Sequence, residues 1–341
     1  MELGPLWGSC FCGVCLGPST VIYYLKKVGM VLRIERGLRW ILCILLLSSC
    51  LDMEHKGSRN DIPTKGELEI AVDVNDSLLF VQLVDRFHEL YPKAHITLRF
   101  MAPITLLEGV RDDKIPALYL NHTFDSAMVD ALESRRVKVR SHEIGASATA
   151  FIVNRSNPNH RLSTDSLKKM LSGECKTWSK SNEPVVFALL KNDLIYHDLT
   201  LFYSRQGGKD AKKIAPPKMV QLASPQAVFD FVNKTPGALG FVGSNWIADR
   251  GDTLAKHNRK SIRVLEVQNP ISGEFHLPYQ SQVFAKQYPF VRTIMGYDLQ
   301  GYSGLAQGFL AFCCDQSGQV IVKKSGLSPA LPPARTIQLE N

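Results

Sequence analysis

After residue 65, short apolar runs alternate with amphipathic stretches along the chain. Three apolar runs have the length of strands: residues 68–72, 96–100 and 117–120. Three stretches place apolar side chains at helical spacing: residues 77–91, 104–110 and 124–134. Asp76 or Ser77 is the expected N-cap of the first helix, and Pro92 is its expected stop. This order predicts an α/β fold with a mainly parallel sheet that has helices on both faces.

A second series of the same kind follows in the middle of the chain. Three apolar runs predict buried strands: residues 150–153, 185–190 and 238–242. A helix is predicted over residues 164–171, with Gly173 as its C-terminal stop. Ser224 and Pro225 have the residue types of an N-cap and a first helical turn. Two α/β series in one chain predict two lobes with a ligand cleft between them.

Residues 33–50 have the pattern of a lipoprotein signal peptide. Arg33, Arg36 and Arg39 precede an apolar run that is short for a membrane-spanning helix and that ends in Leu-Ser-Ser-Cys, at Cys50. A bitopic anchor or a buried helix is the alternative reading of this run. We expect cleavage before Cys50, whose sulfur would carry the lipid.

The segments before and after this signal are expected to have different roles. Met30 stands where such a signal should start, so residues 1–29 are expected to be upstream sequence without a function. Residues 1–49 are therefore assigned to an upstream segment and signal peptide. Residues 50–65 are mostly polar and aperiodic, and are expected to tether the folded domain to the membrane.

Charge and cysteine content narrow the classes of function. The 341-residue chain has a formal net charge of +8, and removing residues 1–49 leaves 35 Lys and Arg against 30 Asp and Glu. The basic residues are dispersed and form no stripe interleaved with aromatic residues, which argues against a nucleic-acid partner and suits a weak preference for anions. Cys175, Cys313 and Cys314 are expected to be free thiols, because adjacent cysteines rarely pair.

The sequence offers no residues for catalysis, for a metal or for a cofactor. The histidines show no His-x-x-x-His or paired Cys/His spacing of a zinc site. His197 and Asp198 are adjacent, and neighbouring side chains on a helix diverge by about 100°. No nucleophile elbow and no Gly-Lys-Ser/Thr phosphate loop is present. We therefore expect a binding protein and not an enzyme.

Three stretches carry the motifs of a known family. Residues 150–178 contain a strand, an Asn-Pro turn and a helix, followed by Ser-Gly-Glu and Trp. Residues 236–242 form a Pro-Gly-Ala-Leu-Gly-Phe-Val strand motif. Residues 288–329 form a C-terminal helical region. In this order and spacing they resemble the phosphate-binding family of periplasmic solute-binding proteins of ABC importers, in a lipoprotein form. The resemblance covers most of residues 66–335.

The resemblance implies a two-lobed periplasmic binding protein fold of type II, in which the chain crosses twice between the lobes. Lobe one would take residues 66–145 and 270–341, and lobe two residues 146–269. It also implies a protein of the cell envelope, lipid-anchored and either facing the periplasm or on the outer membrane. Such a protein would capture phosphate or a similar small anion and present it to a membrane permease.

Oxyanions in such clefts are held by backbone N–H groups at helix N-termini and by hydroxyl groups. The loops at strand ends and near the crossover offer seven candidates: Asp76, Ser77, Asn121, Thr123, Ser147, Thr149 and Asn192. Ser77 also fits an ordinary N-cap, and Asn121 and Thr123 also fit plain turn chemistry.

The chain departs from the family at two places that matter for phosphate. The Asp-Gly pair expected near the crossover is replaced at residues 145–149, and no Arg-x-x-x-Ser-Gly-Thr loop follows residues 185–190. Lys191 lies there, but it lacks the planar fork of an arginine, and no arginine is in place. The alternative is therefore an envelope accessory or interaction module with a degenerate anion pocket. A hydrolase is a more distant third reading.

Overall fold

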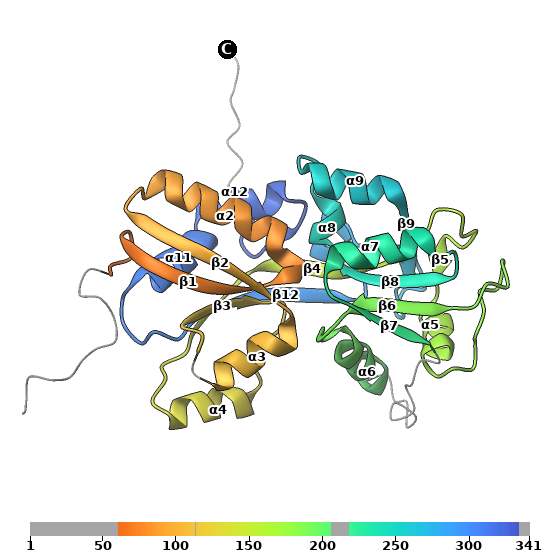
Figure 1. The fold of residues 1–341 in the computed structure, drawn as a ribbon, viewed down its shortest axis with the longest axis horizontal. Helices are drawn as coiled ribbons and strands as arrows, with labels where there is room; N and C mark the ends of the chain where they lie inside the picture. Colours follow the sequence, from red (N-terminus) through yellow and green to blue (C-terminus); the bar gives the residue numbers. More distant parts are fainter. Residues whose placement is uncertain (1–60, 113, 206–217, 334–341) are drawn as a thin grey trace, which may run out of the picture. The chain divides into compact units, whose positions relative to one another are not determined.

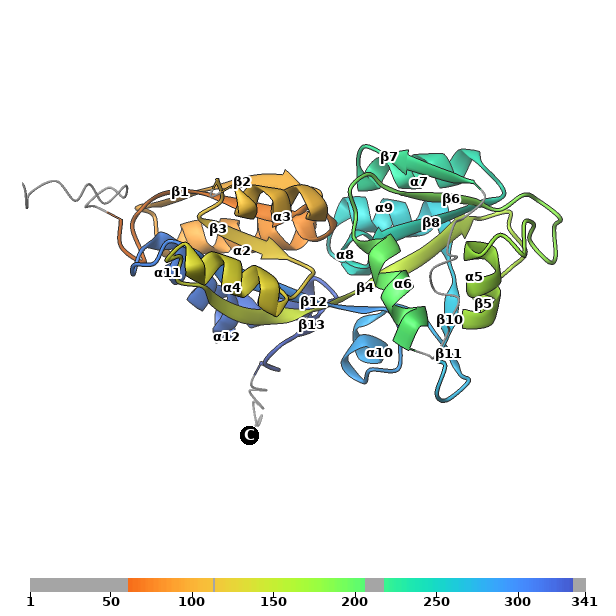
Figure 2. The ribbon, with the colours of Figure 1, turned by 90° about the horizontal axis from the view of Figure 1, so that it is seen from below.

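The computed structural model describes residues 61–112, 114–205 and 218–333. The predictions for the upstream segment, the signal peptide, Cys50 and most of the tether lie outside these residues. Within them, strands and helices alternate in two groups, and β4 and β12 run between the groups in two perpendicular views (Figure 1 and Figure 2).

The first group contains one half of the main sheet. Its strands follow the spatial order β2 (Ala94–Met101), β1 (Gly66–Asp73), β3 (Ala117–Leu120), β12 (Val291–Asp298) and β4 (Arg140–Asn154), with β13 (Ser328–Pro329) also paired to β4. Its helices are α2 (Ser77–Leu90), α3 (Pro103–Arg111), α4 (Ser126–Ser134), α11 (Leu305–Cys314) and α12 (Gln316–Lys324). β1 pairs in parallel with β2 and β3, whereas β12 runs antiparallel to β3 and β4.

The second group continues the sheet from β4. The order is β4, β8 (Ala238–Gly243), β6 (Val186–Leu190) and β7 (Met219–Leu222), and β9 (Ile262–Val264) also pairs with β4. A small separate sheet contains β11 (Phe275–His276), β10 (Glu266–Gln268) and β5 (Arg161–Leu162). The helices are α5 (Thr164–Leu171), α6 (Ile195–Arg205), α7 (Pro225–Lys234), α8 (Asn245–Ala248), α9 (Thr253–Ser261) and α10 (Gln280–Phe284).

The predicted α/β fold with two lobes is confirmed, but the sheet is mixed and not mainly parallel. The outer strands of each half pair in parallel, as βαβ units require. The inner pairs are antiparallel because β12 and β8 both run against β4. The antiparallel pairs of β12 arise from the second crossing of the chain, which brings β12 back between β3 and β4.

β4 is one continuous strand of 15 residues, whereas the sequence pattern predicted a strand only from about Thr149. Its first half pairs with β12, and its second half pairs with β8 and β9. Residues 140–143 are polar and only half-buried or exposed, so they lack the apolar signature of the buried half. The crossover at residues 145–149 therefore lies inside a strand and not in a loop.

The hydrophobic side chains form separate cores on the two sides of this crossing. Leu79, Phe87 and Phe309 belong to a core on the β1 side, and Phe151 and Phe187 belong to a core on the β6 side. The lobe limits drawn from the sequence stay a prediction.

The packing suggests one adjustment to those limits. Val283, Tyr288 and Phe290, which the sequence placed in lobe one, pack into the core of the β6 side. This packing favours a second crossing near Val291, where β12 begins.

The folded unit includes residues that the sequence assigned to the tether. The carboxylate of Asp61 accepts hydrogen bonds from the Leu305 backbone N–H and from the Tyr302 hydroxyl, each at 2.9 Å. Asp61 thus satisfies a free N–H group at the start of α11. Cys175, Cys313 and Cys314 are free thiols, as predicted. No helix in the described ranges is long and apolar enough to cross a membrane.

Phe309 provides a test of the lobe-one core. Its ring lies edge-on to Phe87 at 5.3 Å and to Tyr119 at 5.5 Å between centroids, and it is fully buried. Phe309→Ala should lower the free energy of unfolding by about 3–5 kcal/mol, measured by urea denaturation. Phe284→Ala, at a side chain that is 60% exposed, is the matched control and should cost less than about 1 kcal/mol. Equal losses in the two variants would contradict this packing.

Candidate functional site

The end of β1 forms a tight polar turn that leads into α2. Asp73 caps the short helix η1 (Val74–Asp76): its Oδ1 accepts from the backbone N–H of Asn75 at 2.9 Å and from Asn75 Nδ2 at 3.0 Å. Asp76 stands at the N-cap position of α2, but its side chain makes no capping bond. Because its carboxyl is not used for capping, it is available for other partners.

Asp76 is joined to two other predicted site residues. Asn121, in the loop after β3, donates from Nδ2 to Asp76 Oδ2, and Ser147 of β4 donates from Oγ to Asn121 Oδ1 at 2.9 Å. All three side chains are buried. Parallel strands β1 and β3 end at the same edge of the sheet, so their following loops meet there. The structure thus brings Asp76, Asn121 and Ser147 together.

A buried arginine lies beside this chain of hydrogen bonds. Arg292, near the start of β12, has a side chain that is only 5% exposed. Its Nη2 lies 3.4 Å from Asp193 Oδ1 and 4.0 Å from Asp73 Oδ2, and its Nε lies 3.9 Å from Asp198 Oδ2. These distances are long for charge-assisted hydrogen bonds, and Nε has no hydrogen-bond partner among the described residues. The guanidinium is therefore surrounded by carboxyl groups without being tightly bound.

The excess of carboxyl groups is reflected in their pKa values. Burial raises the pKa of Asp73 to about 6, although Arg292 opposes this shift. Burial and the neighbouring Asp73 hold the pKa of Asp76 well above its usual range. For Arg292, burial lowers the pKa, but Asp193 and Asp73 outweigh it and the net shift is upward. The cluster therefore keeps its arginine charged and favours a proton on Asp76.

The same turn holds the two sides of the crossing together. Asn75 Nδ2 donates to Asp193 Oδ2 at 3.1 Å, and Asn245 Oδ1 of α8 accepts from the Leu79 backbone N–H at 3.1 Å. Trp246 Nε1 donates to the Val74 carbonyl at 3.2 Å. Gly243 lies so close that an added Cβ would be 2.9 Å from the Asn75 carbonyl oxygen. The turn between β1 and α2 therefore also connects the two halves of the fold near the crossing.

A pocket of about 550 Å³ opens next to Arg292. Its lining comes from the loop after β3, from β4, from α6 and from the start of β12: Asn121, His122, Thr123, Thr149, Ile195, Asp198, Leu201, Phe202, Pro289, Phe290, Val291, Arg292 and Thr293. The ring of His122, one of these lining residues, lies 6.3 Å from the ring of His197 between centroids. We refer to this hollow as the cleft pocket.

The seven predicted ligand residues fall into three groups in the structure. Asn121, Thr123 and Thr149 line the cleft pocket, and Asp76 and Ser147 lie directly behind Asn121. Ser77 and Asn192 are not in the lining of this pocket.

Ser77 and Asn192 have other positions. Ser77 is buried as the first residue of α2. Asn192 is exposed, with a left-handed backbone (φ 61°). Its carbonyl accepts from the Ile104 N–H at 3.0 Å, and its Nδ2 bonds Thr105 Oγ1 at 3.3 Å. Asn192 therefore connects α3 to the loop before α6 rather than facing the pocket.

The sequence reasoning missed the charged centre of the site. The arginine was expected in the loop after β6. Arg292 instead comes from β12, 99 residues beyond Asp193. Asp73, Asp193 and Asp198 were missed as well. One available indication was the Lys-Asn-Asp sequence after a buried strand, since the loops at strand ends line such clefts.

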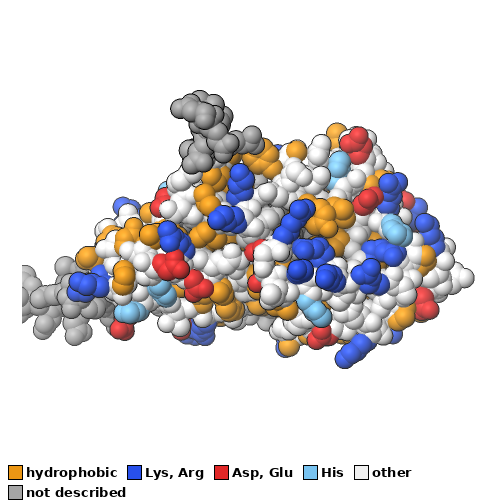
Figure 3. Space-filling view, turned by 90° about the horizontal axis from the view of Figure 1, so that it is seen from above, with side chains coloured by type: hydrophobic (Ala, Val, Ile, Leu, Met, Phe, Trp, Pro, Cys, Tyr) orange, Lys and Arg blue, Asp and Glu red, His pale blue; other side chains and the backbone are white. Residues whose placement is uncertain are grey.

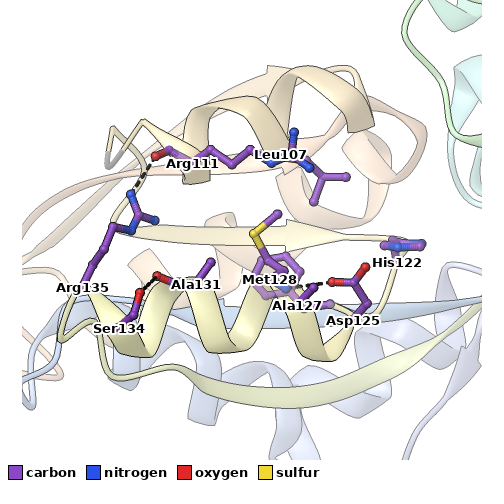
Figure 4. Close-up of a pocket in the computed structure, with 10 residues that line it drawn as sticks. Leu107, Arg111, His122, Asp125, Ala127, Met128, Ala131, Ser134 and Arg135 are labelled. Atoms are coloured by element: carbon purple, nitrogen blue, oxygen red, sulfur yellow. Dashed lines mark hydrogen bonds between the residues drawn. The ribbon is translucent and has the colours of Figure 1, made fainter.

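A second hollow, of about 510 Å³, lies between α3 and α4. Figure 4 shows Leu107 and Met128 pointing toward one another across it and Asp125 and His122 at one end. It shares His122 with the cleft pocket but is lined by neither Arg292 nor the polar cluster. It has no buried charge comparable to Arg292, so we take the cleft pocket as the candidate site.

One face of the molecule carries several basic side chains. Figure 3 shows Lys and Arg side chains gathered on the face that carries α9, where Lys256 and Lys260 are exposed. The lining of the cleft pocket contains no lysine. No group of three or more His, Cys, Asp or Glu side chains in the described ranges is placed to hold a metal ion.

The fold and the comparisons with known proteins agree. Residues 57–316 match the family model of the PBP superfamily domain. The chain belongs to this superfamily. The expectation of a binding protein and not an enzyme agrees with this membership. The resemblance predicted from the sequence is confirmed at the level of the superfamily and of the fold. No curated protein matches this chain.

Three solved structures illustrate the shared fold. A substrate-binding protein of a phosphate ABC transporter from Clostridium perfringens, with bound phosphate, has a TM-score of 0.64 and 14% identity; the match covers 78% of this chain and all of that one. The phosphate-bound protein PfluDING has a TM-score of 0.62 at 12% identity, with 78% and 91% covered. An ABC-type phosphate transport receptor from Vibrio cholerae has a TM-score of 0.56 at 13% identity, with 77% and 100% covered.

Asp73 allows a test of the buried charge cluster. The pKa of Asp73 in the folded protein, about 6, lies above its usual value of 3.8. Between these pH values the folded protein holds a proton that the unfolded chain has released. The contribution of Asp73 to the unfolding free energy therefore becomes less favourable as pH rises from 3.8 to 6. Asn keeps the Oδ1 acceptor but cannot ionise. From pH 4 to pH 7, Asp73→Asn should therefore gain about 2 kcal/mol of unfolding free energy relative to the wild type.

The measurement is urea denaturation of both proteins at several pH values. Asp85→Asn, at an exposed position on α2, is the matched control and should show a difference that is nearly independent of pH. A difference for Asp73→Asn that stays constant from pH 4 to pH 7 would show that Asp73 is not held in this environment.

Proposed function

We propose that this protein is the solute-binding component of an ABC importer and that it captures phosphate or a related small oxyanion in the cleft pocket. The observation that carries the proposal is Arg292: a buried guanidinium at the crossing, with long contacts to its carboxyl neighbours and a free Nε–H. A guanidinium in this state can form bidentate bonds to an oxyanion without first breaking a strong ion pair.

Neutral donors complete such a site. Thr149 and Thr123 line the pocket with hydroxyl groups, and Asn121 provides an amide. The strongly raised pKa of Asp76 reduces the negative charge that an incoming anion meets. The site would thus use a distant arginine where the family uses a Ser-Gly-Thr loop. The relatives with bound phosphate support the same ligand class.

The proposal includes a partner and a place in the cell. A solute-binding protein of this type delivers its ligand to a membrane permease, and the expected lipid on Cys50 would hold it at the envelope, either facing the periplasm or on the outer membrane.

Ligand binding is tested by thermal denaturation of the full chain with phosphate, sulfate and other small oxyanions. A ligand that binds only the folded state raises the melting temperature with its concentration. Arg292→Lys keeps the charge but loses the planar fork, so it should weaken oxyanion binding by about 10- to 100-fold, as expected for charge-assisted hydrogen bonds.

Arg99→Lys is the matched control, since Arg99 is exposed on β2 and lies 3.4 Å from Glu69 at the surface. It should bind oxyanions like the wild type. If no oxyanion stabilises the wild type, or if Arg292→Lys binds them as well as the wild type does, the proposed site is wrong.

The lipid anchor has a separate test. A chain that starts at Met30 should be exported and should incorporate labelled fatty acid as the longer chain does, because the expected signal begins there. Cys50→Ser in this chain should abolish the incorporation, since the sulfur of Cys50 would be the attachment point. Labelling that survives the substitution would refute lipidation at Cys50.

One observation favours a second candidate, an envelope accessory or interaction module with a degenerate anion pocket. Four carboxyl groups, those of Asp73, Asp76, Asp193 and Asp198, act on one arginine and partly take the place of a ligand. In that role the protein would show no oxyanion-dependent stabilisation and would bind another envelope protein. Neighbouring permease and ATPase genes would favour the importer instead.

A further inference from the structure

The cleft pocket is larger than a bare inorganic oxyanion requires. Its volume is about 550 Å³. Phosphate or sulfate fills the space of a few water molecules, at about 30 Å³ each. An anion bound at Arg292 would therefore occupy one end of the pocket and leave most of it open.

The remainder of the pocket has an apolar wall. Leu201 of α6 and Val291 of β12 line it and are 38% and 37% exposed. Beside them, the rings of Phe202 and Phe290 lie 4.5 Å apart between centroids. A single exposed aliphatic side chain is ordinary on a protein surface, but here two of them and two aromatic rings face one hollow. Such a wall favours an apolar group as its neighbour.

The polar end of the pocket also contains a hydrogen-bond acceptor, the carboxyl group of Asp198. Asp198, on the first turn of α6, is 29% exposed. Its nearest basic nitrogens, Arg292 Nε and His197 Nδ1, lie at 3.9 Å and 3.8 Å, beyond hydrogen-bond distance. Its carboxyl group can therefore accept a hydrogen bond from a hydroxyl or amino group of a ligand.

We propose that the ligand is an organic oxyanion, in which the anionic group binds at Arg292 and an attached apolar or aromatic body lies against Leu201, Phe202, Phe290 and Val291. This inference rests on the proposed function, because it uses Arg292 as the anion partner. It adds the class of ligand: a substituted phosphate or carboxylate in place of free phosphate.

The test is calorimetric titration of the full chain with phosphate, methyl phosphate and phenyl phosphate, which share the charged group and differ in the attached body. Phenyl phosphate should bind at least about tenfold more tightly than phosphate, with methyl phosphate between them, because each buried methylene-sized group contributes about fourfold. Val291→Thr, which replaces a methyl by a hydroxyl at constant shape, should lower the ratio of the two affinities by about fourfold.

Val81→Thr is the matched control, because Val81 is 41% exposed on α2 and does not line the pocket. It should leave the ratio unchanged. Equal affinities for phosphate and phenyl phosphate, or a ratio that Val291→Thr does not alter, would overturn the organic ligand while leaving the oxyanion site intact. Binding of phenyl phosphate that survives Arg292→Lys would instead overturn the proposed function, and with it this inference.

Discussion

The burial of Arg292 is the constraint on which the centre of this structure depends. Removing a guanidinium from water is costly unless carboxyl groups surround it. Those groups come from the end of β1, from the loop before α6 and from α6 itself, as Asp73, Asp193 and Asp198. One arginine on the returning strand β12 therefore faces carboxyl groups of segments from both sides of the crossing.

The contacts that hold the halves together and those that would hold a ligand involve the same groups. Asn75 bonds both Asp73 and Asp193, and Asp193 in turn faces Arg292. An oxyanion that binds Arg292 must share it with these carboxyl groups and so must alter their contacts. Ligand binding at this position is for that reason expected to be linked to the relative positions of the two sides, as in closure of a two-lobed receptor.

Local features of the fold were predictable from the sequence, and long-range ones were not. The helix at residues 164–171 and the strand at 117–120 agree with the structure at both ends, because apolar spacing and capping residues fix them locally. Asp76 and Asn121 were both named as candidates in loops at strand ends, and the structure joins them by a hydrogen bond. Arg292 could not be found this way, since its partners lie far along the chain and nothing in its own neighbourhood marks it as buried. The length of β4 could not be predicted, because its two halves pair with different strands and only the second half has an apolar sequence.

Charge balance sets the character of the candidate site. A family-type loop of hydroxyl and backbone N–H donors binds an anion without bringing negative charge of its own. Here the single positive charge is opposed by four carboxyl groups, and burial together with the neighbouring Asp73 drives Asp76 toward its protonated form. An anion bound at Arg292, as proposed, would add further negative charge and raise the pKa values of Asp73 and Asp76 further. Anion binding at this site is therefore expected to be accompanied by proton uptake, because no donor loop of the family type is present to balance the added charge.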